Sequence, residues 1–313
     1  IVDSVRPTSP GVEAILELAL NDSAADVRAD AARTCWNTKR AEVIELVLKQ
    51  LRQPKTRLQP HECYSWSVKE YVGRYSIRKV VTKWAKEVLA AETRVPVRTY
   101  ALILIGKYKE DELLEPIRKS CTAKDPIERR AACHALASVD RDAFVKDFLA
   151  AVAEDPSEKV RLVIPGVYTW GARRWLHYFD EKNLDNEYVY NHNYNAVPKL
   201  DKKVETVLRK LTTDKSRTVR MESYFALLSC RKTVDLAKLV KTLDQFPDVD
   251  AVAYRVYSFL SEHSRRLGKD FALLLPYLER SKRYADDAEK YRLRLGLVED
   301  EEDVPELTLV PRR

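Results

Sequence analysis

The sequence predicts an all-α protein, a two-layer right-handed α-solenoid in which pairs of helices stack side by side. One observation behind this prediction is that only 7 of the 313 residues are Gly. A β-rich fold has many tight turns, and this chain has few Gly residues to form them. Another is the balance of 45% hydrophobic and 33% charged residues, which is typical of amphipathic helices that each expose one polar face. The third is a helix-pair pattern that repeats along the chain.

Six segments share this pattern. A polar or Pro-containing turn leads into an apolar residue and Arg, small and apolar residues follow at helical spacing, and a second apolar helix comes next. The six segments begin at Val27-Arg28, Val97-Arg98, Asp125-Pro126 with Arg130, Val160-Arg161, Val219-Arg220 and Val252. The pattern resembles HEAT repeats, in which stacked neighbours cover the apolar stripe that a single helix pair leaves open. We therefore expect a HEAT-like superhelix, with small Ala residues where helices approach closely.

Residues 1–298 are expected to form the solenoid domain, with inserts at about 54–92 and 166–200 that break the period. The first insert reads as an extra pair of long helices. The second is a loop-like, Asn-rich run, and long irregular inserts are usually functional or mobile. Its candidate interaction residues are aromatic: Trp170, Trp175, Tyr188, Tyr190 and Tyr194. Residues 299–313 are acidic and then basic, and are expected to form a tail or linker.

The sequence carries no recognisable catalytic or cofactor motif. No Gly-x-Ser-x-Gly, Walker-type or dinucleotide-binding Gly pattern occurs. His61-Glu62 lacks the second His four residues later that a helical zinc site requires. We expect no enzymatic activity, no cofactor and no metal. The Arg that follows Val in the repeats could bind a ligand, but we expect it to hydrogen-bond the adjacent turn or an Asp of the neighbouring repeat.

The net charge of +7 indicates an anionic partner, and the basic excess is concentrated between Lys49 and Arg98. Aromatic residues interleave with these cations, as they do in sites for single-stranded nucleic acid. The alternative, which we favour, is that the aromatics form the buried face of a helix and the cations its solvated face. An anionic lipid surface or an acidic receptor would satisfy the same charges. The candidate basic residues are Lys55, Arg57, Lys69, Arg74, Arg78, Lys79, Lys83 and Lys86.

The five cysteines are irregularly spaced and form no Cys-x-x-Cys motif, which argues against structural zinc. Cys121 ends the second helix of one repeat and Cys133 lies in the first helix of the next. A disulfide between them is possible if the protein is secreted, and two buried free thiols are the alternative.

Residues 203–278 carry two linked signatures. The first is Val219-Arg220 followed by Tyr224, Ala226-Leu227 and Cys230, and the second is Val252-Ala253, Val256-Tyr257-Ser258 and Leu260. In type and spacing they resemble the helical domain of the large lipid transfer proteins, the family of vitellogenins, apolipophorins and the microsomal triglyceride transfer protein. The segment departs from that family at Arg231, where Pro is usual, and at Phe259 and Ser223, where His and Ala are common.

This resemblance implies a secreted lipid-transport or yolk-storage lipoprotein, in which the helices act as a structural brace and docking surface. Its partners would be flanking β-rich, lipid-binding domains of the same polypeptide. The alternative is a HEAT-repeat scaffold, with a cytoplasmic location, that binds a protein or nucleic acid through a basic face. A third interpretation, an enzyme like the HEAT-like DNA glycosylases, requires a buried carboxylate beside aromatic residues in a groove.

Overall fold

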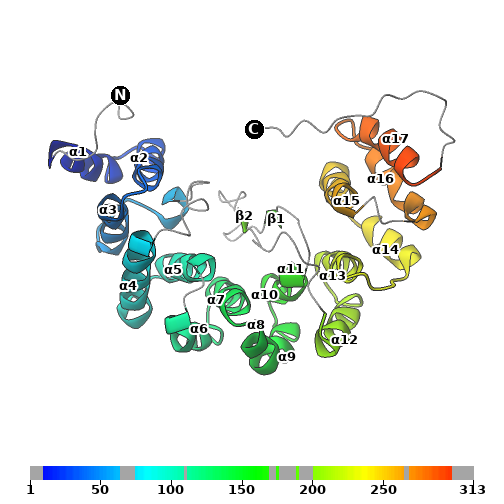
Figure 1. The fold of residues 1–313 in the computed structure, drawn as a ribbon, viewed down its shortest axis with the longest axis horizontal. Coiled ribbons are helices and arrows are strands. Elements are labelled where there is room, and N and C mark those ends of the chain that lie inside the picture. Colours follow the sequence, from blue (N-terminus) through cyan, green and yellow to red (C-terminus); the bar gives the residue numbers. More distant parts are fainter. Residues whose placement is uncertain are drawn as a thin grey trace. The chain divides into compact units, whose positions relative to one another are not determined.

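A computed structural model describes residues 10–63, 75–108, 111–168, 174–175, 188–189, 200–263 and 268–297. Helices dominate these residues, which confirms the predicted α-solenoid (Figure 1). The exception is a pair of two-residue strands, β1 (Arg174–Trp175) and β2 (Tyr188–Val189), which pair antiparallel. The chain divides into two compact units, one made of residues 1–167 and 174–189 and the other of residues 168–173 and 190–313.

The first unit is built from two rows of helices. One row contains α1 (Pro10–Leu20), α3 (Ala41–Arg52), α4 (Tyr75–Ala91) and α6 (Leu114–Ser120), and each helix contacts the next. The other row contains α2 (Ala25–Asn37), the 3-10 helix η2 (Pro60–Cys63), α5 (Val95–Tyr108), α7 (Pro126–Val139) and α10 (Glu158–Arg161). Shorter elements complete the unit: η4 (Asp111–Leu113), α8 (Arg141–Ala143), the π-helical η5 (Phe144–Phe148), α9 (Leu149–Ala153) and α11 (Val163–Tyr168).

Helices α5 and α7 pack closely against each other, and small residues make this approach possible. A Cβ added to Gly106 of α5 would lie 3.1 Å from the Cα of Ala135 on α7, closer than such atoms normally approach. Ala131, Ala132 and Ala135 are all buried on α7. Helix α7 starts sharply because the Asp125 carboxylate accepts hydrogen bonds from the N–H groups of Ile127 and Glu128. The expected Ala residues at close helix contacts are present.

The second unit has the same plan. It comprises α12 (Lys202–Leu211), α13 (Arg217–Ser229), α14 (Leu236–Leu243), α15 (Val249–His263), the 3-10 helix η7 (Lys269–Leu274), α16 (Leu275–Glu279) and α17 (Ala285–Arg294). Phe225 of α13 and Phe259 of α15 meet in its core with ring centroids 5.2 Å apart. Leu227 and Leu260 are only 1% and 0% exposed, so the repeat register predicted for this segment places both in the core as expected.

The segment 54–92 differs from the expected extra helix pair. Its described residues form the short η2 and one long helix, α4, which takes a regular place between α3 and α6. Residues 64–74 lie outside the described residues, as do 298–313 and most of 169–199. None of the helices in the described part of the chain combines the length and apolar character needed to cross a membrane.

Candidate functional surfaces

The arginines of the repeats bind turns of the protein itself. Arg28, Arg129, Arg161 and Arg220 each donate through Nη1 to the carbonyl oxygens six and five residues earlier, at 2.6–3.1 Å. Arg98 likewise donates to the carbonyls of Leu89 and Glu92. The predicted role of these side chains is therefore confirmed. In the third repeat, Arg129 makes these hydrogen bonds to the turn, whereas the sequence pattern had selected the next residue, Arg130.

Several of these arginines also join their repeat to the next one through a carboxylate. Arg98 pairs with Glu128 at 2.8 Å and Arg129 with Asp155 at 2.9 Å. In the second unit Arg255 of α15 pairs with Glu222 of α13 at 3.0 Å. These pairs are largely buried, so removing one partner would leave an uncompensated charge. Their role is to fix adjacent repeats in register.

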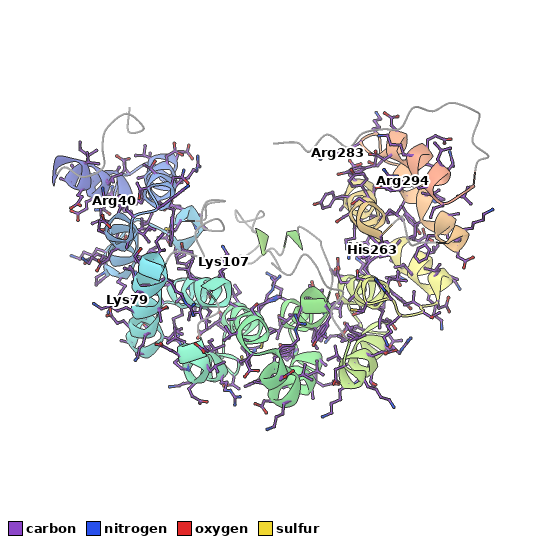
Figure 2. All side chains as sticks on the ribbon, in the orientation of Figure 1. Arg40, Lys79, Lys107, His263, Arg283 and Arg294 are labelled. Atoms are coloured by element: carbon purple, nitrogen blue, oxygen red, sulfur yellow. The ribbon has the colours of Figure 1, made fainter. Side chains whose placement is uncertain are left out.

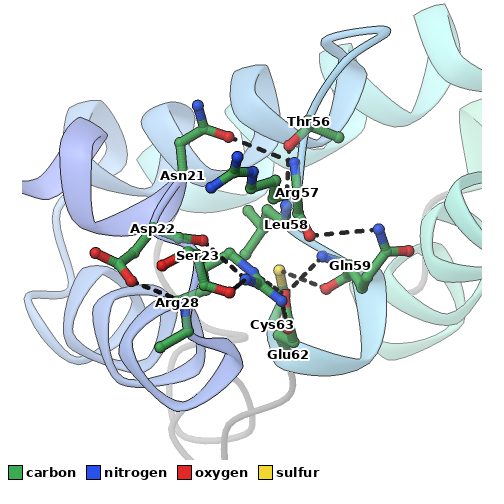
Figure 3. Close-up of polar contacts among 11 residues, drawn as sticks. Asn21, Asp22, Ser23, Arg28, Thr56, Arg57, Leu58, Gln59, Glu62 and Cys63 are labelled. Carbon is green, nitrogen blue, oxygen red and sulfur yellow. Dashed lines mark hydrogen bonds and ion pairs between the residues drawn. The ribbon is translucent and has the colours of Figure 1, made fainter.

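The Arg28–Glu62 pair is the most buried ion pair among the described residues of the first unit (Figure 3). The two side chains are 10% and 4% exposed and approach to 2.5 Å. Glu62 also accepts a hydrogen bond from the N–H of Gln59 at 2.8 Å. Because Arg28 and Gln59 occupy this carboxylate, it is not available as a metal ligand.

The neighbouring His61 adds no metal site. Burial lowers its pKa from the usual value, which favours the neutral ring. Within the ranges that the structure describes, no cluster of three or more His, Cys, Asp or Glu side chains could hold a metal ion.

Six of the eight candidate basic residues are described, and all six are exposed. Lys55 and Arg57 are exposed on the connection between α3 and η2, and Arg78, Lys79, Lys83 and Lys86 are exposed on α4. Figure 2 shows Lys79 on the exposed side of this helix. Lys69 and Arg74 lie outside the described residues. We call Lys79, Lys83 and Lys86 the α4 lysine stripe, because their spacing of four and three residues places them on one side of a helix.

The aromatic residue among these cations is buried. Trp84 is 5% exposed, its ring contacts Tyr100 edge-on at 6.1 Å, and its Nε1 donates to the carbonyl of Leu48 at 2.7 Å. Trp84 therefore fixes α4 to α3 and cannot stack on a base. This is the arrangement that the sequence favoured, with the aromatic side inward and the cations in solvent. Trp66 and Tyr71 lie outside the described residues.

The aromatic insert is described only at its two short strands. Trp175 of β1 stands opposite Tyr188 of β2 in the antiparallel register, so the backbone brings these two candidates together. Trp170, Tyr190 and Tyr194 lie outside the described residues. The function proposed for this insert stays a prediction.

Cys121 and Cys133 are free, buried cysteines. Interaction with the Cys133 thiol, together with burial, raises the pKa of Cys121 far above its usual value. Both are therefore described as free thiols, and a disulfide between them stays a prediction. Protonated, shielded thiols react slowly.

Two surfaces were not anticipated. Ile15 and Leu18 of α1 are 61% and 75% exposed, although they belong to an apolar helix. In the second unit, Tyr257 stacks on Tyr284 with centroids 5.0 Å apart, and Arg294 lies over the ring of Tyr291. Arg283 lies over the ring of Tyr284, and Figure 2 labels both Arg283 and Arg294 in the second unit. Spacing alone could have revealed a second apolar side of α1, because Leu18 lies across the helix from Leu16.

Residues 82–164, from α4 to α11, match the family of HEAT repeats. Within residues 82–164 the helix pairs are therefore of the HEAT type. No curated protein matches the chain. HEAT repeats of this kind imply protein partners, because stacked repeats present extended surfaces for binding.

The comparisons give no support to the expected resemblance between residues 203–278 and the large lipid transfer proteins, and one feature of the backbone weighs against it. Arg231 has φ 59°, a left-handed conformation that Pro cannot adopt. The N–H groups of Arg231 and Lys232 bond the carbonyls of Leu228 and Leu227, which closes the end of α13 in a Schellman motif. The residue usual in that family would break this helix end.

Proposed function

We propose that this protein is a non-enzymatic HEAT-repeat scaffold, and that the α4 lysine stripe binds an acidic segment of a partner protein. The HEAT repeats support a role as a scaffold for protein interaction. The positive charge of the stripe supports an acidic partner segment.

The proposal depends on the observation that the stripe has no carboxylate partner among the residues that the structure describes. Lys79, Lys83 and Lys86 are exposed, and no carboxylate among the described residues lies within ion-pair distance of them. The acidic residue next to them, Glu87, pairs with Arg52 of α3. Three uncompensated ammonium groups on one helix side create a local positive potential that attracts an acidic segment.

An acidic protein segment fits this surface better than single-stranded nucleic acid does. Sites for single strands combine cations with aromatic rings on which bases stack. The described aromatic residue of this region, Trp84, is buried against Leu48 and Tyr100. Among the side chains that the structure describes, the stripe therefore offers charge and hydrogen-bond donors without a stacking platform, and those of Trp66, Tyr71 and Tyr75 lie outside this description.

We do not propose a lipid-transport function for this protein. The residues that carry that resemblance, including Val219, Tyr224, Val256 and Leu260, are buried packing residues. Any stack of HEAT repeats selects similar residues at these positions.

The test compares two triple variants of the full chain. K79E/K83E/K86E reverses the stripe, and K202E/K203E/K241E reverses three exposed lysines of the second unit. Both lower the net charge of +7 by the same six units, so they separate a local site from general attraction. The probe is a fluorescent poly-glutamate peptide, measured by anisotropy at about 50 and 200 mM salt.

We expect the stripe variant to weaken peptide binding at least tenfold, because each exposed ion pair contributes up to about 1 kcal/mol, and the control variant to change it less than about threefold. Equal losses in both variants would refute a local site. If a poly-dT oligonucleotide binds more tightly than the peptide and shows the larger loss, the stripe is a nucleic-acid surface instead.

A further inference from the structure

Four tyrosine side chains of the second unit meet between α15 and α17. Tyr257 of α15 stacks on Tyr284, the N-cap residue of α17, with ring centroids 5.0 Å apart, and it meets Tyr291 of α17 edge-on at 6.2 Å. Tyr254 of α15 lies 6.3 Å from Tyr284. Tyr284 and Tyr291 are 6% and 3% exposed, whereas Tyr254 and Tyr257 are partly exposed. We call these four residues the tyrosine cluster.

Two arginines lie over the buried rings of this cluster. The Arg283 guanidinium lies over Tyr284 and that of Arg294 over Tyr291, each 5.5 Å from the ring centroid. Both arginines are exposed (Figure 2), and no carboxylate among the described residues pairs with either of them. A guanidinium held over a ring keeps the N–H donors of its own plane free for an anion. The rings therefore position two guanidinium groups without neutralising them.

Two carboxylates of the described residues act on the cluster, and both are engaged. Asp287 of α17 forms an ion pair with Lys290 at 2.9 Å, which balances its charge. Asp250 of α15 accepts a hydrogen bond from the Ser281 hydroxyl at 2.6 Å. Burial raises the pKa of both buried phenols of the cluster, so these rings stay neutral at neutral pH and do not repel an anion.

The segment around the cluster has an excess of positive charge. Residues 268–297 contain seven Lys and Arg against five Asp and Glu. Lys269 lies beside the end of α17, because a Cβ added to Gly296 would lie 3.8 Å from its Cε, and it is exposed. Together with Arg283 and Arg294, this lysine favours an anionic ligand.

The spacing of the two arginines indicates an extended ligand. Tyr284 and Tyr291 are seven residues apart, which is two helical turns or about 10 Å along the axis, and each of them holds one guanidinium. A ligand with anionic groups along its length can contact both guanidiniums in turn. It fits this arrangement better than a ligand with a single phosphate or carboxylate group does.

Partly exposed rings distinguish this surface from the α4 lysine stripe, where the described ring of Trp84 is buried. Single-stranded nucleic acid binds where cations are combined with aromatic rings or guanidinium planes on which unpaired bases stack. Tyr254 and Tyr257 supply such rings beside Arg283 and Arg294. An acidic protein segment would use the cations of this surface and leave the rings unused.

We propose that the tyrosine cluster, together with Arg283 and Arg294, binds single-stranded nucleic acid. In this complex the two guanidiniums contact backbone phosphates, and unpaired bases stack where Tyr254 and Tyr257 reach the solvent. Contacts to phosphates and to base faces carry little sequence information, so the surface accepts strands of different sequence. This surface belongs to the second unit and does not depend on the function proposed for the α4 lysine stripe.

The experiment measures binding of the full chain to a fluorescent oligo-dT strand of about 12 nucleotides by anisotropy, at about 50 mM salt. R283Q/R294Q removes both guanidiniums, and R283K/R294K keeps the charge while removing the planar groups. K215Q/K241Q is the matched control, because Lys215 and Lys241 are also exposed in the second unit but lie outside the cluster. A second probe is an abasic strand of the same length, which keeps the phosphates and lacks the bases.

For the wild-type chain, we expect the abasic strand to bind about tenfold more weakly than oligo-dT, because stacking on the rings is lost. R283Q/R294Q should weaken oligo-dT binding by about fivefold or more, and R283K/R294K by about twofold to fivefold. K215Q/K241Q, which removes the same two charges as R283Q/R294Q, should change it by less than about twofold.

Equal binding of the abasic strand and oligo-dT would make the surface a general anion site and would overturn the proposal. Unchanged binding by R283Q/R294Q, equal losses in K215Q/K241Q, or absence of oligo-dT binding at about 100 µM protein would overturn it as well. Tighter binding of a poly-glutamate peptide, weakened by R283Q/R294Q, would assign the surface to an acidic protein instead. The abasic comparison uses the wild-type chain, so it decides the proposal even if a variant folds poorly.

The two polyanion tests can fail independently. K79E/K83E/K86E should weaken oligo-dT binding no more than K202E/K203E/K241E does, because both variants lower the net charge equally. A larger loss in K79E/K83E/K86E would place the strand on the α4 lysine stripe and would overturn this proposal. Failure of the poly-glutamate peptide to bind that stripe would refute the proposed function and leave the tyrosine cluster unaffected.

Discussion

Replacing Arg28 by Met should destabilise the first repeats strongly. The side chain of Met keeps much of the packing of the Arg stem but leaves the Glu62 carboxylate, which is 4% exposed, without its cation. It also removes the hydrogen bonds to the carbonyls of Asp22 and Ser23. Breaking one side of a buried ion pair costs about 3–5 kcal/mol. We expect R28M to lose that much local stability.

The loss should be confined to the repeats that meet at this pair, because repeats in a solenoid contact only their neighbours. Hydrogen exchange with mass spectrometry measures such local opening. A loss of about 3–5 kcal/mol corresponds to exchange that is faster by about a hundredfold to a few thousandfold. Amides of α2 and η2 should show this change, while those of α13 in the second unit keep their wild-type rates.

A double-mutant cycle tests the cause. E62Q in the R28M background leaves no charge buried, and the side-chain amide oxygen that it introduces can still accept the hydrogen bond from the N–H of Gln59. The double variant should therefore recover about 1–3 kcal/mol relative to R28M. The control is R33M on the same helix, whose partner Asp30 is exposed, and it should change stability by less than about 0.5 kcal/mol. The reasoning would be refuted if the stability losses of R28M and E62Q simply added in the double variant. It would also be refuted if R28M accelerated amide exchange in α13 as much as in α2.

Three other changes give measurable outcomes. R231P should destabilise α13 by about 3 kcal/mol or more, because Pro cannot adopt the φ of 59°, whereas R231G should be neutral or slightly stabilising; hydrogen exchange of α13 distinguishes them. L260A should cost about 2–5 kcal/mol in chemical denaturation, and L273A, at 52% exposure, less than about 0.5. Arg94 lowers the pKa of Glu92 to about 2, so the pair stabilises the fold above the unfolded value of about 4.5 and loses this contribution as pH falls from there to about 2. E92Q lacks this contribution, so its melting temperature should change less with pH over that acid range than that of the wild-type chain. The difference should correspond to about 1–2 kcal/mol, because Arg94 is partly exposed.

Helical periodicity was sufficient to predict the α-solenoid and the exposure of the α4 lysine stripe. On α4, Ile77, Val81 and Val88 are buried while Lys79 and Lys83 are exposed, as a period of 3.6 residues requires. The position of α4 was harder to predict. The described residues before α4 form only the short η2, and the sequence pattern of the repeat is interrupted there, so α4 reads as an insert.

Other features depend on neighbours that a local pattern does not contain. Apolar residues lie on two sides of α1, and the sequence alone does not tell which side packs against α2. Arg129 and Arg130 are adjacent, and only the turn geometry, with carbonyls five and six residues earlier, selects Arg129. The resemblance at residues 203–278 depended on Tyr224 and Leu260, whose identity reflects packing that unrelated HEAT stacks share.

The ion pairs between repeats also determine how the first unit responds to mechanical load. Arg98 and Glu128, and Arg129 and Asp155, each connect one repeat to the next through contacts of 2.8–2.9 Å, and such contacts are lost after a very small displacement. A pull along the stack should therefore separate one interface at a time, giving a series of small force peaks in a single-molecule extension experiment. Each separated interface could re-form on release without disturbing the helices on either side, so the stack would yield and recover stepwise.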